Sequence, residues 1–576
     1  MNTKRVAAIT PTPACMKTRI LPKFFFDLAF VLSLIVLYPA VVAAQKVTAR
    51  APINPAFEAF QAAQRMGTLQ TMSADGHALG YIPSPVNLQH TAGQNALVPH
   101  LLGSYPVAYD LRALGKVTPV RNQGACGCCW TFGTFASLES CLLPGETGDF
   151  SENNLKNTHG FDYGTCDGGD VAMATAYLAR WIGPATEAAD PYHPWDDRPS
   201  PAVPAVKHIQ EVLFPSLRAS ATDNDGIKQA IMTYGAVTSD FYYDDPYYNG
   251  ATYAYYYNGG NYPNHEIAIV GWDDNFDKSK FASTPPGNGA FIIKNSWGSG
   301  WGEAGYFYIS YYDTQIGMRE MAVFENGEWT SNYTRIYQYD PLGWISGTGY
   351  GSTTAWLANV FTAVGTEQLR AIGFYTPAAN SSYQIYVYRN PSSPPIGGSP
   401  VGSVTGTVAY AGYHTVGLAS PASLSAGQQF SVVIKLTTPG YNYPICTEVA
   451  IPGYSSGATA AAGQSYISYN GTAWQDVTTW DSTGNVCIKA FSSTASLRVT
   501  AINLESNKVR VTWLTSGGQT NVVQATNGDA TGRYTNNFTN LSPPYIIPGS
   551  SDILTNYLDT SATNLPSRYY RVRLVP

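Results

Sequence analysis

The chain has 576 residues, of which 12% are charged and 13% aromatic, and its formal net charge is −6. A chain of this length predicts three or four domains at ~100–200 residues each. The acidic balance and the lack of a long basic run exclude nucleic acid as a partner. The 41 tyrosines and 54 glycines are typical of β-rich domains with many turns.

Residues 1–44 have the pattern of an export signal. Two basic residues precede an apolar run over 28–37, and small residues follow up to Ala44. This order predicts a signal peptide cleaved after Ala44, and therefore a secreted or cell-surface protein. A membrane anchor is the alternative, but the apolar stretch is short for a ~20-residue span and contains Pro39.

Residues 45–104 read as a leader, with a helical stretch near 57–66 and then chain punctuated by Pro and Gly. The next unit, 105–328, opens with a helical pattern after Cys129, continues with Gly- and Pro-rich loops and closes with strand-like runs. Its clearest predicted elements are helices over 131–143 and 226–234 and strands over 267–272, 290–294 and 306–311.

The pattern over 333–493 is all strand, with short runs separated by Gly, Pro, Ser and Asn clusters. Such spacing predicts a β-sandwich or barrel. Residues 497–576 predict a smaller sandwich of the immunoglobulin or fibronectin type, which we interpret as a spacer or attachment module.

A cysteine-rich segment, QGACGCCW, begins at Gln123 and leads into the first predicted helix. Its last thiol, Cys129, lies at the positive end of the helix dipole, which favours the thiolate. A thiolate is the attacking species in acyl transfer. Cysteine-rich turns also form disulfides and metal sites, so the segment needs partners elsewhere in the chain.

Two further segments supply those partners. His265 opens an apolar, strand-like run, and Asn295 begins the segment NSWGSGWG. A side-chain amide can accept a hydrogen bond from the histidine ring and fix its tautomer, and Trp297 can shield that bond from water.

Together these three segments resemble the papain-like cysteine peptidase family over Tyr105 to about Phe324. The resemblance implies an α+β papain-like two-subdomain peptidase, helical on one side of a cleft and β-rich on the other, followed here by all-β sandwich domains. It also implies roles: Cys129 as nucleophile in a thiolate–imidazolium pair with His265, Asn295 as orienter, and Gln123 with the Cys129 backbone N–H as oxyanion hole. No cofactor or metal is implied.

The sequence departs from the family pattern before the nucleophile, where Cys128 replaces a small residue. Cys128 is therefore an alternative nucleophile or a redox partner. The spacing from Gln123 and the following Trp130 favour Cys129, and adjacent cysteines pair only in strained geometry.

The segment CDGG at 166–169 resembles the family's Cys-Asn-Gly-Gly. The resemblance implies a disulfide between Cys126 and Cys166, and a backbone rail for extended substrate at Gly168 and Gly169. In an exported protein the two cysteines of the β-rich region, Cys446 and Cys487, are also predicted to pair. We interpret Cys141 as a buried free thiol.

The second departure is Glu266, which follows His265. In the family this position walls the pocket for the second residue before the cleaved bond. With Asp170, Glu266 would favour Lys or Arg there, because charge-assisted hydrogen bonds are about twice as strong as neutral ones. The alternative is that Glu266 turns away and pairs with a neighbouring donor.

Three other histidines, His159, His193 and His208, have no Asn-Ser-Trp-Gly partner, and we interpret them as surface or core residues. The segment DNDG at 223–226 hints at calcium but reads better as a helix cap. No metal site is predicted.

The resulting hypothesis is a secreted bacterial cysteine endopeptidase made as a zymogen and acting on proteins or peptides. One alternative is a different Cys/His enzyme, such as a cell-wall endopeptidase or a transglutaminase-like acyltransferase. The other is a catalytically weak adhesin acting through 333–493, which resembles the lectin-like domain that follows papain-like domains in bacterial proteins. Under that reading a carbohydrate or another cell-surface ligand would be the partner.

Overall fold

The computed structural model describes residues 48–575, except for 95, 97–103, 196–199, 495–496, 517–518, 535–536, 549–551 and 563–566. The predicted signal peptide over 1–44 lies outside the described residues, as does most of the chain just before Tyr105. None of the described helices is long and apolar enough to cross a membrane.

The leader contains a short strand, a helix and a single 3-10 turn: β1 (Ala49–Arg50), α1 (Pro55–Met66) and η1 (Gln89–Thr91). Helix α1 begins because the Asn54 side chain caps it, and it ends because Gly67 adopts a left-handed conformation with φ of 66°. Apolar leader side chains, Phe57 and Ile82 among them, belong to the same buried core as the residues that follow. The leader thus folds as part of the main body of the protein.

Between residues 105 and 329, most of the helices lie in the first half of the stretch. They are α2 (Cys129–Leu142), α3 (Glu152–Thr158), α4 (Val171–Ala179) and α5 (Asp225–Thr233), with 3-10 turns η2 (Asp245–Tyr247) and η3 (Lys278–Lys280). The strands are β2 (Ala108–Asp110), β3 (Lys207–Phe214), β4 (Val237–Phe241), β5 (Tyr248–Asn249), β6 (Ala254–Tyr255), β7 (His265–Asp273), β8 (Ala290–Lys294), β9 (Tyr306–Ser310) and β10 (Met321–Trp329).

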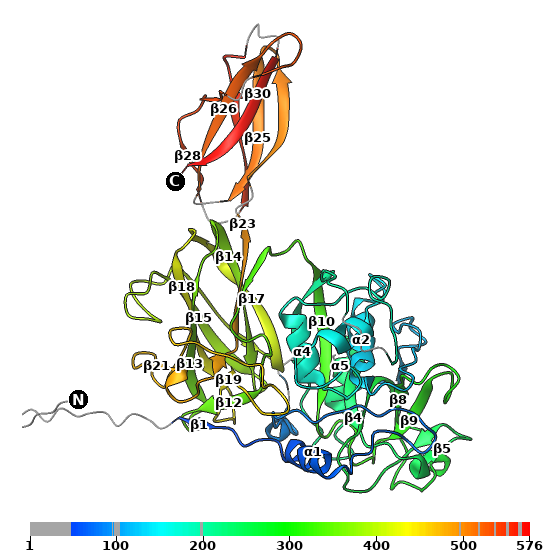
Figure 1. Ribbon diagram of the computed structural model, residues 1–576. Helices are drawn as coiled ribbons and strands as arrows, with labels where there is room; N and C mark the ends of the chain where they lie inside the picture. Colours follow the sequence, from blue (N-terminus) through cyan, green and yellow to red (C-terminus); the bar gives the residue numbers. More distant parts are fainter. Residues whose placement is uncertain are drawn as a thin grey trace, which may run out of the picture. The chain divides into compact units, whose positions relative to one another are not determined.

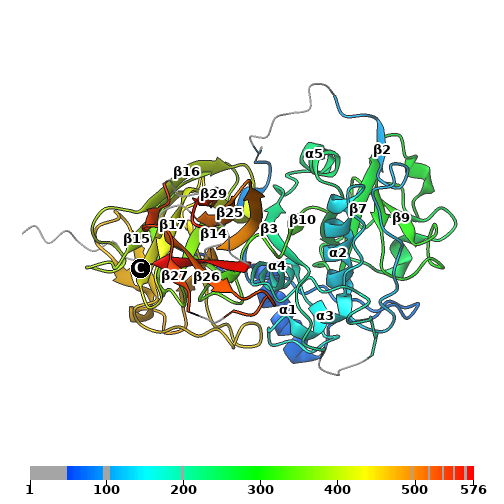
Figure 2. The same cartoon turned by 90° about the horizontal axis from the view of Figure 1, so that it is seen from above.

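Helix α2 is buried along nearly its whole length and packs against β7 and β10 (Figure 2). Strands β10, β4, β7, β8 and β9 are neighbours in this order in one sheet. The first residue of α2 therefore lies next to the first residue of β7, so that Cys129 and His265 are close together.

Residues 335–494 contribute strands to three sheets, and many of their apolar side chains form a second core. Their elements are β11 (Arg335–Tyr337), β12 (Ser346–Gly349), β13 (Thr354–Thr362), β14 (Glu367–Thr376), β15 (Ser381–Arg389), β16 (Gly402–Val408), β17 (Ala411–Leu424), β18 (Gln429–Thr437), β19 (Ile445–Glu448), β20 (Ser465–Ser468), β21 (Gln475–Asp476), η4 (Val477–Thr479), β22 (Asn485–Val486) and β23 (Ile488–Thr494). Alternating side chains such as Leu357, Ile385 and Ile434 fill this core, as the period of a half-buried strand requires.

One strand pair connects this sandwich to the preceding region (Figure 1). Strand β17 pairs antiparallel with β3, with Tyr413 opposite Val212, so that a single sheet runs from β11 to β5. Strand β3 was not among the elements predicted from the sequence, and for that reason the continuous sheet was not predicted either.

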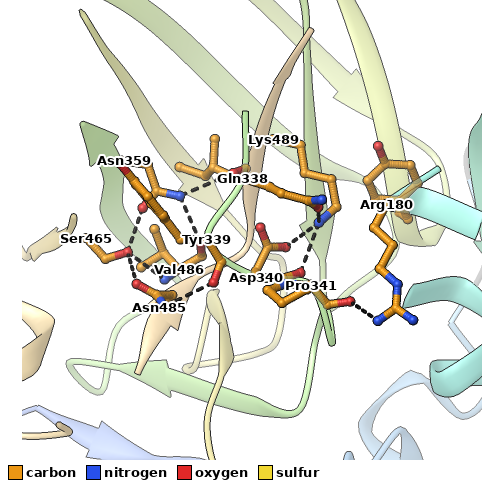
Figure 3. Close-up of polar contacts among 12 residues, drawn as sticks. Arg180, Gln338, Tyr339, Asp340, Pro341, Asn359, Ser465, Asn485, Val486 and Lys489 are labelled. Carbon is orange, nitrogen blue, oxygen red and sulfur yellow. Dashed lines mark hydrogen bonds and ion pairs between the residues drawn. The ribbon is translucent and has the colours of Figure 1, made fainter. Parts of the chain in front are cut away.

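A buried polar cluster lies where the two regions meet, as Figure 3 shows. The Lys489 ammonium donates to the Asp340 carboxylate at 2.9 Å and to Gln338 at 2.8 Å. Arg180, which follows α4, donates to the carbonyl of Pro341 at 2.9 Å. The side chains of Lys489 and Asp340 are almost fully buried, so each charge depends on the other for compensation.

We expect Lys489→Ala to lower the free energy of unfolding by about 3–5 kcal/mol, because it leaves the Asp340 carboxylate buried and unpaired. Thermal unfolding followed by circular dichroism measures the effect. The control is Lys435→Ala, which removes a half-buried lysine over the Trp356 ring. Equal midpoints for the two variants would contradict the assigned role of the cluster.

The C-terminal residues form a small sandwich of their own. Its elements are β24 (Arg498–Glu505), β25 (Lys508–Ser516), β26 (Thr520–Gly528), β27 (Thr539–Asn540), β28 (Tyr545–Ile546), β29 (Asp552–Asp559) and β30 (Ser567–Val575). One sheet has the order β24-β25-β29, and in the other β26 pairs with β27, β28 and β30. Val511, Trp513 and Val523 form its core.

Candidate active site

Cys129 is the first residue of α2 and is fully buried. The helix leaves its first N–H groups without intrahelical partners, which makes this end electropositive. The Cys129 sulfur accepts a hydrogen bond from the backbone N–H of Glu266 at 3.4 Å. The thiol therefore lies directly beside the start of β7.

His265, the first residue of β7, is held by two neighbours. Its Nε2 lies 2.8 Å from Oδ1 of Asn295, which follows β8, and the ring of Trp297 stacks on the imidazole at 4.7 Å. His265 Nδ1 is buried and has no hydrogen-bond partner in the described part of the chain. The asparagine thus fixes the ring through Nε2 and leaves Nδ1 available for proton transfer.

Gln123 reaches the same place from the segment before α2. Its Oε1 accepts from the Ser296 hydroxyl at 2.6 Å, which fixes the amide orientation. Its Nε2 then donates to two carbonyl oxygens, those of Cys126 at 2.9 Å and of Ala78 at 3.1 Å. Since Ala78 belongs to the leader, a leader carbonyl lies where the amide would bind an oxyanion.

The leader backbone continues across the cleft. Ile82 N–H donates to the Gly169 carbonyl at 2.9 Å, and Gly169 N–H donates to the Gly80 carbonyl at 3.0 Å, in a parallel bridge. Gly80 lies so close to the nucleophile loop that a Cβ there would be 2.0 Å from the Gly127 oxygen. The backbone rail expected at Gly169 is therefore occupied by the leader.

His77 of the leader completes this cover. Its ring stacks on Trp297, with centroids 4.4 Å apart and planes 9° from parallel. Trp297 is thus held between His77 on one side and His265 on the other. The aromatic ring that shields the His265–Asn295 bond is itself covered by the leader.

Burial shifts the pKa values of both members of the pair. It lowers the pKa of His265 to about 4, and it raises the pKa of the Cys129 thiol, with the nearby Glu266 adding to the rise. Both shifts favour neutral groups. In this structure both shifts oppose the thiolate–imidazolium pair expected from the sequence.

The remaining cysteines are arranged in three ways. Cys126 and Cys166 are joined by a disulfide, and Cys128 is buried with its sulfur 3.0 Å from the Tyr192 hydroxyl. Cys141 is free and half-buried, so it is less enclosed than expected.

The pairing predicted for Cys446 and Cys487 is corrected: both are free, buried thiols. Cys446 belongs to β19 and Cys487 lies between β22 and β23, where its N–H donates to the Cys446 carbonyl. Both side chains pack into the apolar core as small hydrophobic groups. The absence of other cysteines nearby in the sequence was therefore not sufficient evidence that these two form a disulfide.

Asp170 and Glu266 are both fully buried on the side of the cleft that Tyr81 of the leader enters. Asp170 caps α4 and accepts from the Tyr454 hydroxyl at 2.6 Å. The Glu266 carboxyl accepts a hydrogen bond from the Thr238 hydroxyl at 2.5 Å. Thr238 is therefore a neighbouring donor of the kind that the alternative interpretation of Glu266 requires. Gly168 precedes the rail residue and has a φ of 114° that favours glycine.

The other histidines lie apart from the site. His159 is buried and accepts from the Phe161 N–H, His208 stacks on Trp181 at 3.7 Å, and His193 is exposed. No group of three or more His, Cys, Asp or Glu side chains among the described residues could hold a metal ion. In the segment at 223–226, Asn224 occupies the N-cap of α5 without a side-chain capping bond.

Gln123→Ala is expected to lower kcat by about 10²–10³-fold, the usual loss on removing one oxyanion-hole donor. The measurement is hydrolysis of a fluorogenic peptide by the chain after leader cleavage. Asn122→Ala is the matched control, since that exposed side chain only accepts from the Gly124 N–H. Wild-type kcat in Gln123→Ala would contradict the role of the amide.

Comparisons with known proteins agree on two domains. Residues 105–326 match the family described as "Papain family cysteine protease", and residues 336–492 match the family described as "Lectin like domain". The senescence-specific cysteine protease SAG12 of Arabidopsis thaliana is 29% identical over 216 residues, which are 36% of this chain and 57% of that protein. The matched segment thus spans little more than half of that curated relative.

Two solved structures match over both domains. One contains the cysteine protease and lectin-like domains of Cwp84, a surface layer associated protein of Clostridium difficile, with a TM-score of 0.66 and 26% identity over 78% of this chain and 98% of that chain. The other is the clostridial cysteine protease Cwp84 after propeptide cleavage, with a TM-score of 0.59 and 29% identity over 67% of this chain and 99% of that chain. The predicted fold class, a papain-like unit followed by all-β domains, is confirmed. Residues 105–326 of this chain are therefore a papain-family cysteine protease domain, and residues 336–492 are a lectin-like domain.

Proposed function

We propose that the chain, once its leader is released, is a secreted cysteine endopeptidase in which Cys129, His265, Asn295 and Gln123 perform the reaction. The observation that carries this proposal is the 2.8 Å contact of His265 Nε2 with Asn295 beside a thiol at a helix N-terminus. This arrangement leaves Nδ1 as the atom that exchanges protons with Cys129 and with substrate.

The proposed reaction has two halves. The Cys129 thiolate attacks the scissile carbonyl carbon, and the resulting oxyanion is bound by Gln123 Nε2–H and the Cys129 N–H. His265 gives its Nδ1 proton to the leaving amine as the C–N bond breaks, which produces a thioester. Neutral His265 then takes a proton from water, the resulting hydroxide attacks the thioester, and the C–S bond breaks to release a carboxylic acid and restore the Cys129 thiolate beside protonated His265.

The domain limits proposed with this function are a signal peptide at 1–44, a propeptide at 45–104, the peptidase at 105–328, the lectin-like sandwich at 333–493 and the C-terminal sandwich at 497–576. The contacts of Ala78 and Gly80 across the cleft support a zymogen. Cwp84 is described as surface layer associated and as losing a propeptide, which supports an extracytoplasmic location and leader removal here. Protein or peptide substrates are the proposed partners, with a carbohydrate or cell-surface ligand for the lectin-like domain.

The test is hydrolysis of a denatured protein by the leader-cleaved chain, with the products identified by mass spectrometry. We expect internal cuts that a thiol-directed epoxide stops and that serine-protease inhibitors and chelators leave unchanged. Absence of hydrolysis, with Cys129 unreactive in the cleaved chain, would overturn the proposal in favour of a binding protein that acts through residues 333–493.

A further inference from the structure

Tyr81 of the leader is 5% exposed and inserts its side chain among four buried carboxyl groups. Burial raises the pKa of its hydroxyl well above the usual value, and the nearby carboxyl groups of Asp240, Glu320, Asp170 and Glu266 add to the rise. Below, the acidic pocket means the space that Tyr81 fills between these four side chains. Because the leader is the removable part of the chain, this space is vacated when the leader leaves.

Three of the four acids come from adjacent strand positions of one sheet. Asp240 on β4 is directly opposite Glu266 on β7, and Glu320, just before β10, donates its N–H to Asp240 Oδ1 at 3.0 Å. Like charges at such positions destabilise a sheet. Asp170 faces them from the start of α4. The fold therefore concentrates acidic groups here at a cost in stability.

Three carboxyl oxygens of the acidic pocket lack a hydrogen-bond donor in the part of the chain that the structure describes. Asp240 Oδ2, Glu266 Oε2 and Glu320 Oε2 are buried and have no hydrogen-bond partner within the described residues. None of the four acids forms a salt bridge with a described lysine or arginine. Arg319 acts on Asp240 electrostatically, but its guanidinium lies over the Tyr262 ring.

The acidic pocket adjoins the nucleophile. The Tyr81 N–H donates to the carbonyl of Asn264, the residue before His265, and the Glu266 N–H donates to the Cys129 sulfur. In the family that these motifs resemble, the residue after the catalytic histidine walls the pocket for the second residue before the cleaved bond. That residue here is Glu266, so Asp240 and Glu320 extend the same pocket inward.

We propose that the acidic pocket binds the side chain of an arginine or lysine at the second substrate residue before the cleaved bond, with Asp240 and Glu320 as its direct partners. This inference rests on the proposed peptidase function. Tyr81 offers one hydroxyl hydrogen to a pocket with three unpartnered carboxyl oxygens, whereas a guanidinium offers five N–H donors and a compensating charge. Tyr81 acts as a neutral plug, and the substrate cation completes the hydrogen bonding of the pocket.

The test uses the leader-cleaved full chain and fluorogenic peptides that differ only at this position, with Arg, Lys, Leu or Tyr. We expect kcat/KM for Arg and Lys to exceed that for Leu and Tyr by at least about 10-fold. In Glu320→Gln and Asp240→Asn the Arg-to-Leu ratio of kcat/KM should fall toward unity. Glu328→Gln, an exposed carboxyl at the far end of β10, is the matched control and should keep the wild-type ratio.

Each preparation is normalised to the fraction of Cys129 that an epoxide labels, so a poorly folded variant still reports its own ratio. A wild-type preference for Leu or Tyr would overturn the proposal, as would an unchanged ratio in both Glu320→Gln and Asp240→Asn. These outcomes leave peptidase activity intact and so contradict only the assignment of the acidic pocket. A cleaved chain that hydrolyses none of the peptides and does not label at Cys129 would contradict the peptidase function itself.

Discussion

Cys129→Ala is expected to lower kcat/KM of the leader-cleaved chain by at least about 10⁴-fold, because no other group in the site can form the thioester. Cys128→Ser is expected to keep most of the activity. The Cys128 sulfur points to Tyr192, whose hydroxyl also donates to the Gln123 carbonyl at 2.7 Å. Serine preserves a polar partner at that position.

The two variants form a matched pair, since they change adjacent thiols that are both fully buried. Burial raises the pKa of both thiols, so it is their geometry that separates them. Cys129 is the first residue of α2 and lies beside the start of β7, whereas the Cys128 sulfur faces the Tyr192 hydroxyl. Hydrolysis of a protein substrate, with rates corrected for folded protein, distinguishes them. A Cys128→Ser variant as inactive as Cys129→Ala would show that the nucleophile was assigned to the wrong cysteine.

A precursor whose leader cannot be cut is expected to hydrolyse peptides at least about 10³-fold more slowly than the cleaved chain. A difference of this size requires docking of the leader to be favoured by about 4 kcal/mol. Three contacts support docking of the leader. The Ala78 carbonyl accepts a hydrogen bond from the Gln123 amide, Gly80 packs against the loop before Cys129, and His77 stacks on Trp297.

Gly80→Ala in the uncut precursor sharpens this test. The added Cβ would lie 2.0 Å from the Gly127 oxygen, so the leader cannot seat and activity should rise toward that of the cleaved chain. Gln64→Ala is the control, because it shortens an exposed side chain on helix α1 of the leader. Intact mass verifies that the leader is uncut. If uncut and cleaved chains are equally active, the leader is not inhibitory.

The segments around Cys129 and His265 could be predicted from the sequence because each carries its information locally. A thiol before a helical pattern, and a histidine at the start of an apolar run, mark element ends that the structure has at α2 and β7. The predicted helix over 226–234 likewise corresponds to α5 within one residue at each end.

Asp240 and Glu320 could not be found in this way. Each lies in an ordinary strand-like sequence, and they meet only because β4 pairs with β7 on one side and with β10 on the other. Such long-range registers depend on how the whole sheet assembles. The pairing of β17 with β3 escaped prediction for the same reason.

The role of Tyr81 was equally hidden. Within the sequence it belongs to a Pro- and Gly-punctuated stretch with no pattern of its own, and its burial comes from contacts with distant strands. The unpaired state of Cys446 and Cys487 also depends on the surrounding core, which the count of cysteines does not reveal.

The most direct measurement is the site and stoichiometry of labelling by a thiol-directed epoxide, mapped by mass spectrometry before and after leader cleavage. The account predicts one label per cleaved chain, on Cys129, with loss of hydrolysis in proportion to labelling, and almost no label on the uncut precursor. A label on Cys128 or Cys141, or full hydrolysis by a chain whose Cys129 is labelled, would contradict it.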